Sequence, residues 1–262
     1  MKTSKIDLPQ ELDEIEILPL ADFHIGDMMS DWDHIKSLLE YVRTKDNCYC
    51  VLGGDLMDTA IASSIGDTYA ANLSPMSQIE MCVKLFDPIK DKILAVCGGN
   101  HENRTYKTDG IDMTQIFCNQ LGIGSRYTAT TALLFIRFGK GDRKADKTHP
   151  VRKMCYTVYL AHGSGGGRKE GGKINRLADL AQIVDSDVYI CGHTHLPALF
   201  KTGYYRTNSG NSSVQYVTKL FVNTASALNY GGYGDIQGYK PGAKDYPIIR
   251  LSGGKKRATA EL

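Results

Sequence analysis

The sequence predicts an α/β fold, because strand-like and helix-like segments alternate along the chain. Short apolar runs rich in β-branched and aromatic residues recur, and turn residues bound each of them, as is typical of strands. The expected strands are residues 15–22, 48–55, 92–100, 156–163 and 187–193. Helix-like stretches lie between them at 31–45, 75–90, 113–122 and 174–184. We find no internal repeat and no linker, so we expect a single domain spanning residues 1–262.

The helix expected at 75–90 shows the spacing that the prediction depends on. Met76, Ile79, Val83 and Phe86 follow one another at intervals of three and four residues. This spacing is typical of a helix with one buried face.

The later part of the chain is predicted as strands joined by loops. Residues 131–139 and the strand beginning near Tyr156 flank a basic segment, which we interpret as an exposed hairpin insertion at 139–153. Further strands are expected at 214–226 and 246–253, followed by a mobile C-terminal tail. The tyrosine-rich segments 204–210 and 229–239 are either turn-rich loops packed by tyrosines or stacking surfaces for a nucleic-acid base; we favour the loops.

Composition excludes several classes of protein. A net charge of +2 is too small to imply an obligate polyanionic partner. The seven cysteines form no CxxC pair and several lie in apolar runs, so we expect reduced core thiols in a reducing compartment. The first twenty residues lack a signal-peptide pattern, and no apolar run approaches the ~18 residues of a membrane helix. We therefore expect a cytoplasmic protein with no membrane partner, and a homo-oligomer remains open.

Polar residues that bind metals follow the ends of five expected strands. The motifs are Asp22-x-His24, Gly54-Asp55-x-x-Asp58, Gly99-Asn100-His101-Glu102, His162-Gly163 and Gly192-His193-Thr194-His195. The carboxyl edge of an open α/β sheet is where ligands bind. Imidazole, carboxylate and carboxamide groups together suit Zn, Mn, Fe or Ni. Seven such ligands exceed the needs of one tetrahedral ion and suit two ions roughly 3.5–4 Å apart.

Each motif alone is a weak signal, because a lone Asp-x-His is usually a turn. Their order over residues 22–195 resembles the calcineurin-like metallophosphoesterase family. The resemblance implies a four-layer αββα sandwich of two mixed β-sheets, with a binuclear metal site at the carboxyl ends of the strands. It also implies hydrolysis of a phosphate ester by a water that two divalent ions activate, and we expect Mn to support activity best.

The family resemblance also assigns roles to residues. Asp55 bridges the two ions, and the remaining ligands divide into a first set of Asp22, His24 and His195 and a second set of Asn100, His162 and His193. His101 faces the scissile phosphate without binding metal. Asp58 resembles the carboxylate that hydrogen-bonds this histidine, although it could equally cap a helix in the segment that follows.

The substrate is less well defined by the sequence. Serine/threonine phosphatases of the family continue the second motif with Arg-Gly, and that arginine binds the phosphate monoester. Thr59 and Ala60 stand here instead, which favours phosphodiesterases and nucleases. The nucleases usually carry Asp where Glu102 stands. Arg168, Lys169 and Lys173, in the glycine-rich loop 163–173, are candidate substrate-binding residues, or the loop is simply a surface feature.

Three functions therefore remain open. The leading one is a phosphodiesterase acting on a nucleotide or nucleic acid. The basic segment 139–153 is either a binding surface for a nucleic-acid backbone or an ordinary solvated face. The second is a phosphomonoesterase for a small molecule or phosphoprotein. The third is an inactive binding scaffold, which the complete set of predicted ligands disfavours.

Overall fold

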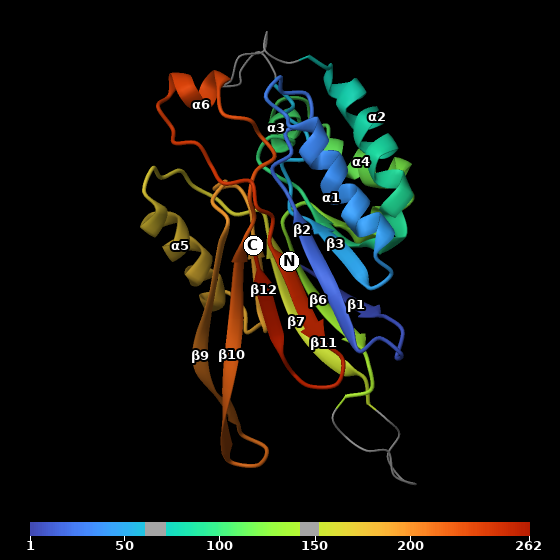
Figure 1. Ribbon diagram of the computed structural model, residues 1–262, viewed down its shortest axis with the longest axis vertical. Coiled ribbons are helices and arrows are strands. Elements are labelled where there is room, and N and C mark those ends of the chain that lie inside the picture. The colour runs from blue at the N-terminus through green and yellow to red at the C-terminus, as the bar shows by residue number, and fades with distance from the viewer. Residues whose placement is uncertain (61–71, 142–151) are drawn as a thin grey trace.

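The fold is built on two six-stranded mixed β-sheets packed face to face, in a computed structural model that describes residues 1–60, 72–141 and 152–262 (Figure 1). The first sheet has the strand order β1 (Lys2–Asp7), β6 (Thr131–Phe138), β7 (Met154–Ala161), β8 (Val188–Cys191), β10 (Ser213–Asn223) and β9 (Ala198–Asn208). The second has the order β12 (Ala258–Glu261), β11 (Ile248–Ser252), β2 (Glu14–Leu20), β3 (Cys48–Leu52), β4 (Ile93–Cys97) and β5 (Tyr127–Thr128).

Helices cover the outer faces of both sheets and complete four layers (Figure 1). On the second sheet lie α1 (Trp32–Thr44), α2 (Pro75–Phe86) and α4 (Met113–Gln120), and α5 (Glu170–Asp179) lies on the first. The short helices are α3 (Asn103–Asp109) and α6 (Gly232–Ile236), with 3₁₀ turns η2 (Asp87–Lys92), η3 (Gly124–Arg126) and η4 (Leu180–Gln182). Three buried apolar clusters separate the layers, one between the sheets and one under each helical layer. The αββα sandwich is therefore confirmed.

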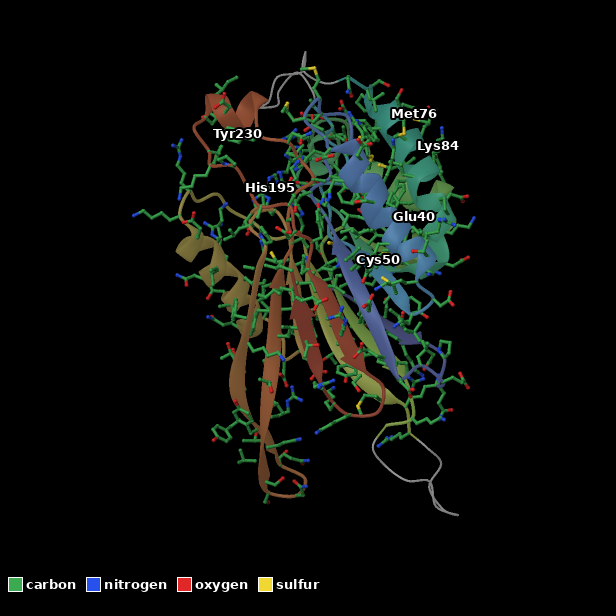
Figure 2. The ribbon with its side chains drawn as sticks, viewed as in Figure 1. Glu40, Cys50, Met76, Lys84, His195 and Tyr230 are labelled. Carbon is green, nitrogen blue, oxygen red and sulfur yellow. The ribbon has the colours of Figure 1, made fainter. Side chains whose placement is uncertain are left out.

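Local sequence signals explain where the helices begin and which face they bury. Asp31 caps α1 by accepting from the backbone N–H of His34 at 3.1 Å, and Ser74 caps α2 in front of Pro75. In α2 the buried face includes Ile79 and Phe86 as expected, whereas Met76 is 52% exposed (Figure 2). The expectation for Met76 was wrong because the first turn of α2 projects beyond the sheet it covers.

The five strands expected before the polar motifs are all present, as β2, β3, β4, β7 and β8. Four further strands were missed, among them the two-residue β5. β1 pairs in parallel with β6, and β9 occupies residues 198–208, so the loop expected from residue 204 begins inside a strand. The expected mobile tail is also corrected, because Ala258–Glu261 pairs antiparallel with β11.

The expected hairpin of β6 and β7 is present, with Phe138 opposite Met154. Most of the basic segment between these strands, residues 142–151, lies outside the described residues. All seven cysteines are free thiols and six of them are buried, as expected of core residues. None of the described helices has both the length and the apolar character needed to cross a membrane.

Candidate metal centre

The predicted ligands come together where the two sheets meet at the carboxyl ends of their strands. Asp22, Asp55 and Asn100 follow β2, β3 and β4 of the second sheet, whereas the histidine ligands 162, 193 and 195 follow β7 and β8 of the first. The backbone N–H of His193 donates to Asp22 Oδ2 at 2.9 Å and so joins the two sheets at this point. In Figure 2, His195 lies at this junction, above the strands and between α5 and α1.

The first predicted ligand set is close enough to share one ion. His24 Nε2 lies 3.2 Å from His195 Nε2, and Asp22 Oδ1 lies 3.4 Å from the same His195 nitrogen. One ligand atom from each of the three residues lies within 4.8 Å of the other two. Asp22 and His24 are buried, whereas His195 is partly exposed, so the set opens to solvent on one side.

The second predicted set converges on a single atom, His162 Nε2. This nitrogen lies 3.1 Å from Asp55 Oδ2, 3.2 Å from His193 Nδ1 and 2.9 Å from Asn100 Oδ1. The other ring nitrogen, Nδ1, donates to the carbonyl oxygen of Gly53 at 2.8 Å. That hydrogen bond directs the Nε2 lone pair into the site, as partners of metal-binding histidines usually do.

The spacing of these donor atoms fits a divalent ion. Atoms bound about 2.1 Å from one tetrahedral ion lie about 3.4 Å from one another. The distances in the two sets, from 2.9 to 3.4 Å, are close to that separation. Imidazole, carboxylate and amide oxygen are also the donors that ions such as Zn and Mn accept.

The charge of Asp55 stabilises a positive charge beside it. Burial alone would raise the pKa of Asp55, but the adjoining His162 and His101 outweigh it and lower that pKa. Burial would lower the pKa of His162, but Asp55 outweighs it and raises that pKa to about 10. The carboxylate thus holds a positive charge beside it even when the site is buried. A metal ion would have to displace that proton, which couples metal binding to pH.

Backbone strain is concentrated at the predicted ligands. Among the residues that the structure describes, seven non-glycine residues have positive φ, and five of them belong to the predicted ligand set: Asp22, His24, Asp55, His193 and His195. Such conformations are uncommon outside glycine and are costly, so they persist where surrounding structure holds them for a function. The backbone angles therefore indicate a functional site at the same place as the side-chain distances, and they do so independently of those distances.

His101 has the partners that the family role requires. Its Nδ1 lies 3.0 Å from Asp58 Oδ1, and its Nε2 lies 3.9 Å from Asp55 Oδ2. Burial would lower the pKa of His101, but the Asp58 hydrogen bond and the charge of Asp55 raise it. His24, Asp58 and His101 are also close enough to bind an ion of their own. The alternative role of Asp58 as a helix cap concerns a segment that lies mostly outside the described residues.

Glu102 is a site residue whose role was missed in the sequence. Its buried carboxylate accepts from the backbone N–H groups of Asp55 at 3.0 Å, Leu56 at 2.6 Å, Met57 at 3.1 Å and Gly99 at 3.1 Å. Burial and the charge of Asp55 raise its pKa to about 7. A Cβ at Gly99 would clash with Asp55, so only glycine allows these two loops to approach. The GNHE motif includes Gly99 and Glu102, but it does not reveal that Glu102 contacts the loop after β3.

Arg104 was also missed, although it follows the same motif by two residues. Its guanidinium donates to the carbonyl oxygen of Asp58 at 3.1 Å, and its Nη2 lies 3.0 Å from His101 Nε2. The sequence signal was a lone basic residue between an expected strand and an expected helix, which does not reveal where the side chain lies.

The candidate substrate loop is partly engaged in contacts with the protein. Arg168 Nη2 donates to the carbonyl oxygen of Gln237 at 3.0 Å, and Lys173 Nζ donates to that of Thr194 at 2.7 Å. Thr194 lies between two predicted ligands, so Lys173 contacts the backbone of the metal centre. Lys169 is exposed and has no hydrogen-bond or ion-pair partner within the described ranges.

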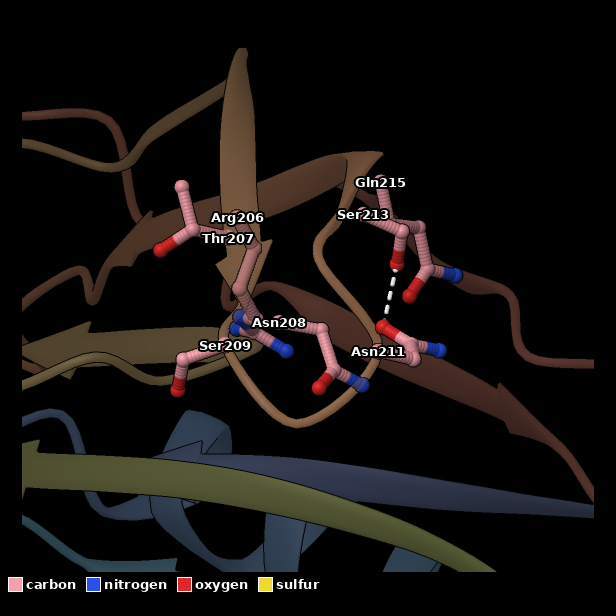
Figure 3. Close-up of a pocket in the computed structure, with 7 residues that line it drawn as sticks. All are labelled: Arg206, Thr207, Asn208, Ser209, Asn211, Ser213 and Gln215. Carbon is pink, nitrogen blue, oxygen red and sulfur yellow. Dashed lines mark hydrogen bonds between the residues drawn. The ribbon is translucent and has the colours of Figure 1, made fainter.

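A polar cavity of about 430 Å³ lies at the far end of the molecule (Figure 3). It is formed by the tip of the β9–β10 hairpin, which extends away from the metal centre (Figure 1). Its charged group, Arg206, is paired with Asp185 at 2.8 Å. This cavity therefore offers no group for acid–base or metal chemistry.

The sandwich and the convergence of these groups place the chain in the class of αββα phosphoesterases. Residues 20–197, more than half of the chain, match the family described as calcineurin-like phosphoesterase. The chain belongs to this family, as the order of its motifs implied. Membership supports a metal-dependent hydrolase of phosphate esters.

Solved structures provide more distant similarities. A conserved protein of Streptococcus pneumoniae TIGR4, described as a predicted phosphoesterase, is 12% identical, with 95% of this chain and 99% of that one covered and a TM-score of 0.36. Vps29 of Entamoeba histolytica, solved with Zn²⁺, is 13% identical, with 94% and 97% covered and a TM-score of 0.40. No curated protein gives a significant match.

Proposed function

We propose that this protein is a binuclear phosphodiesterase whose substrate is a nucleotide or a nucleic acid. The observation that carries the metal assignment is the convergence of seven donor side chains from both sheets, most of them on strained backbone. In this proposal Asp55 is shared by two ions, and the other ligands form a set of Asp22, His24 and His195 and a set of Asn100, His162 and His193. Manganese is the proposed metal for activity.

Bound divalent ions would supply the positive charge that makes water more acidic near neutral pH and offsets charge on the phosphate. The side chains of the protein do the remaining work. His101 is oriented by Asp58 so that its Nε2 faces the metal centre, where it stabilises the phosphate or protonates the leaving oxygen. Glu102 holds the backbone of the Asp55 loop, so that the shared carboxylate keeps its position.

The preference for a diester rests on the residue after Asp58. Thr59 is buried, and its hydroxyl donates to the carbonyl oxygen of His101, so no arginine side chain is presented from this position. A diester carries one charge fewer than a monoester and has less need of that arginine. In this proposal the loop that carries Arg168, Lys169 and Lys173 borders the substrate site. Arg168 and Lys173 contact the protein, whereas Lys169 has no partner among the described residues.

Metal-dependent hydrolysis of two aryl phosphates tests this function. With Mn²⁺ added, we expect faster turnover of bis-p-nitrophenyl phosphate than of p-nitrophenyl phosphate, and loss of both activities with a chelator. A preference for the monoester would favour a phosphomonoesterase. Bound metal without hydrolysis of either compound or of a nucleotide diester would favour a binding scaffold. Replacing the three loop cations with Ala should raise KM for the nucleotide diester and leave the small diester nearly unaffected.

A further inference from the structure

Arg104 lies at the edge of the metal centre, on the first turn of α3. Its Nη1 donates to the carbonyl oxygen of Asp58 at 3.1 Å, and its Nη2 lies 3.0 Å from His101 Nε2. The same His101 nitrogen is 3.9 Å from Asp55 Oδ2, which is the carboxylate proposed to be shared by the two ions. Arg104 therefore holds its guanidinium beside the one catalytic nitrogen that faces the metal centre.

Among the described residues, no carboxylate neutralises the charge of Arg104. In the part of the chain that the structure describes, no Asp or Glu lies within ion-pairing distance of this half-buried side chain. A guanidinium is always protonated and carries five N–H donors, of which the two contacts above use two. Half-buried charges are usually paired, so a cation placed this way points to an anion as its partner.

The neighbouring groups support the same conclusion. His101 Nε2 accepts from the guanidinium at 3.0 Å, and the N–H groups of Arg104 that remain can donate to an oxygen of an anion held beside this pair. A guanidinium at this nitrogen also opposes metal binding by His101, because two cations would be brought together. The pair is thus arranged for a negatively charged oxygen next to the ions.

Arg104 differs in its place on the chain from the arginine that the serine/threonine phosphatases of the family carry directly after Asp58. Thr59 at that position points inward, with its N–H bonded to Gln78 Oε1 at 2.9 Å and its hydroxyl to the carbonyl oxygen of His101. Arg104 contacts the carbonyl oxygen of the same Asp58 from α3. The charge is thus supplied by a different segment of the chain.

We propose that Arg104 is a catalytic residue that binds a non-bridging oxygen of the substrate phosphate together with His101. This inference rests on the proposed phosphoesterase function. Arginine recognises phosphate through two parallel N–H donors, and these are strongest when negative charge increases on the phosphate oxygens. Arg104 would serve a monoester or a diester, because each has a non-bridging oxygen.

The test compares Arg104→Ala and Arg104→Lys with Lys107→Ala, which removes an exposed cation from the same helix. Metal content, kcat and KM for bis-p-nitrophenyl phosphate, and inhibition by inorganic phosphate are measured on each Mn²⁺-loaded protein. We expect Arg104→Ala to keep its metal, to lose about 10²–10³-fold in kcat and to bind inorganic phosphate at least about tenfold more weakly. Arg104→Lys should recover part of the phosphate binding, because it keeps the charge without the two parallel donors.

Each other result overturns the assignment. Phosphate binding by Arg104→Ala equal to that by Lys107→Ala would show that the guanidinium does not contact phosphate. Loss of metal in both Arg104 variants would give Arg104 a role in holding the ligand set instead. If the parent itself neither bound metal nor hydrolysed phosphate esters, the proposed function would fail along with the inference. An active parent with unaffected variants would overturn the inference alone.

Discussion

His101 lies between two groups that act on opposite sides of its ring. Asp58 accepts from Nδ1, which leaves Nε2 toward Asp55 and Arg104. Both ring nitrogens are therefore engaged without a metal ion. This arrangement favours a catalytic role for His101 over membership of the ligand set, although His24 and Asp58 are close enough to form such a set with it.

Replacing His101 with Ala separates these two roles. We expect the variant to keep the metal content of the parent and to lose about 10²–10⁴-fold in kcat, the usual contribution of a positioned acid or base. Elemental analysis and steady-state kinetics measure the two quantities, and His34→Ala, in a histidine that contacts Lys244 away from the centre, is the control. Metal loss in His101→Ala alone would make His101 a ligand.

The positions of the predicted ligands that follow a strand end could be predicted, whereas the contacts that residues make across loops could not. Asp22, Asp55 and His162 each follow an apolar run, so the edge of a sheet brings them together whatever the loops do. Glu102 and Arg104 follow the same motif, but their partners depend on the path of the loop after β3. No local pattern in a single sequence specifies that path.

Elements were predicted well where burial is nearly continuous. β2, β3, β4 and β8 are almost wholly buried, so their sequences are apolar runs. The missed strands are edge strands with exposed residues: β1 alternates between half-buried and exposed, and most of β9 is exposed. Their pairing comes from the neighbouring strand, which a local pattern does not reveal.

A buried carboxylate joins several of these elements. Glu16 on β2 accepts from Tyr41 Oη at 2.8 Å and Lys45 Nζ at 3.1 Å near the end of α1, and from Arg250 Nε at 3.2 Å on β11. Burial alone would raise the pKa of Glu16, but these donors outweigh it and lower that pKa. The charged carboxylate therefore stabilises the folded protein above the pKa of an unfolded glutamate. This contribution is lost as the pH falls through the folded pKa.

Glu16→Gln tests this contribution. At neutral pH we expect the free energy of unfolding to fall by about 1–3 kcal/mol, the usual value of hydrogen bonds to a charged group. The difference from the parent should shrink below about pH 4, where the unfolded glutamate is protonated. Urea unfolding at both pH values measures it. Glu40→Gln, which removes an exposed pair with Arg43 on α1, should change stability little (Figure 2). A pH-independent difference would contradict the account.

At the scale of the whole molecule, the candidate metal centre lies where the two sheets meet. Asp22, Asp55 and Asn100 come from one sheet, and His162, His193 and His195 come from the other. Because each proposed set takes ligands from both sheets, the centre depends on the full sandwich rather than on one βα unit. The separation of the motifs along the sequence follows from this, since β2, β3 and β4 of the second sheet precede β7 and β8 of the first along the chain.

The number of divalent ions bound per chain tests the central claim most directly. We expect elemental analysis of the Mn²⁺-loaded parent, freed of excess ion, to give about two ions per chain. Asp55→Asn should lose most of this metal together with most of the activity, because one carboxylate is proposed to serve both ions. A parent that binds no ion or only one, or an Asp55→Asn variant that keeps two ions and the turnover of the parent, would contradict the account.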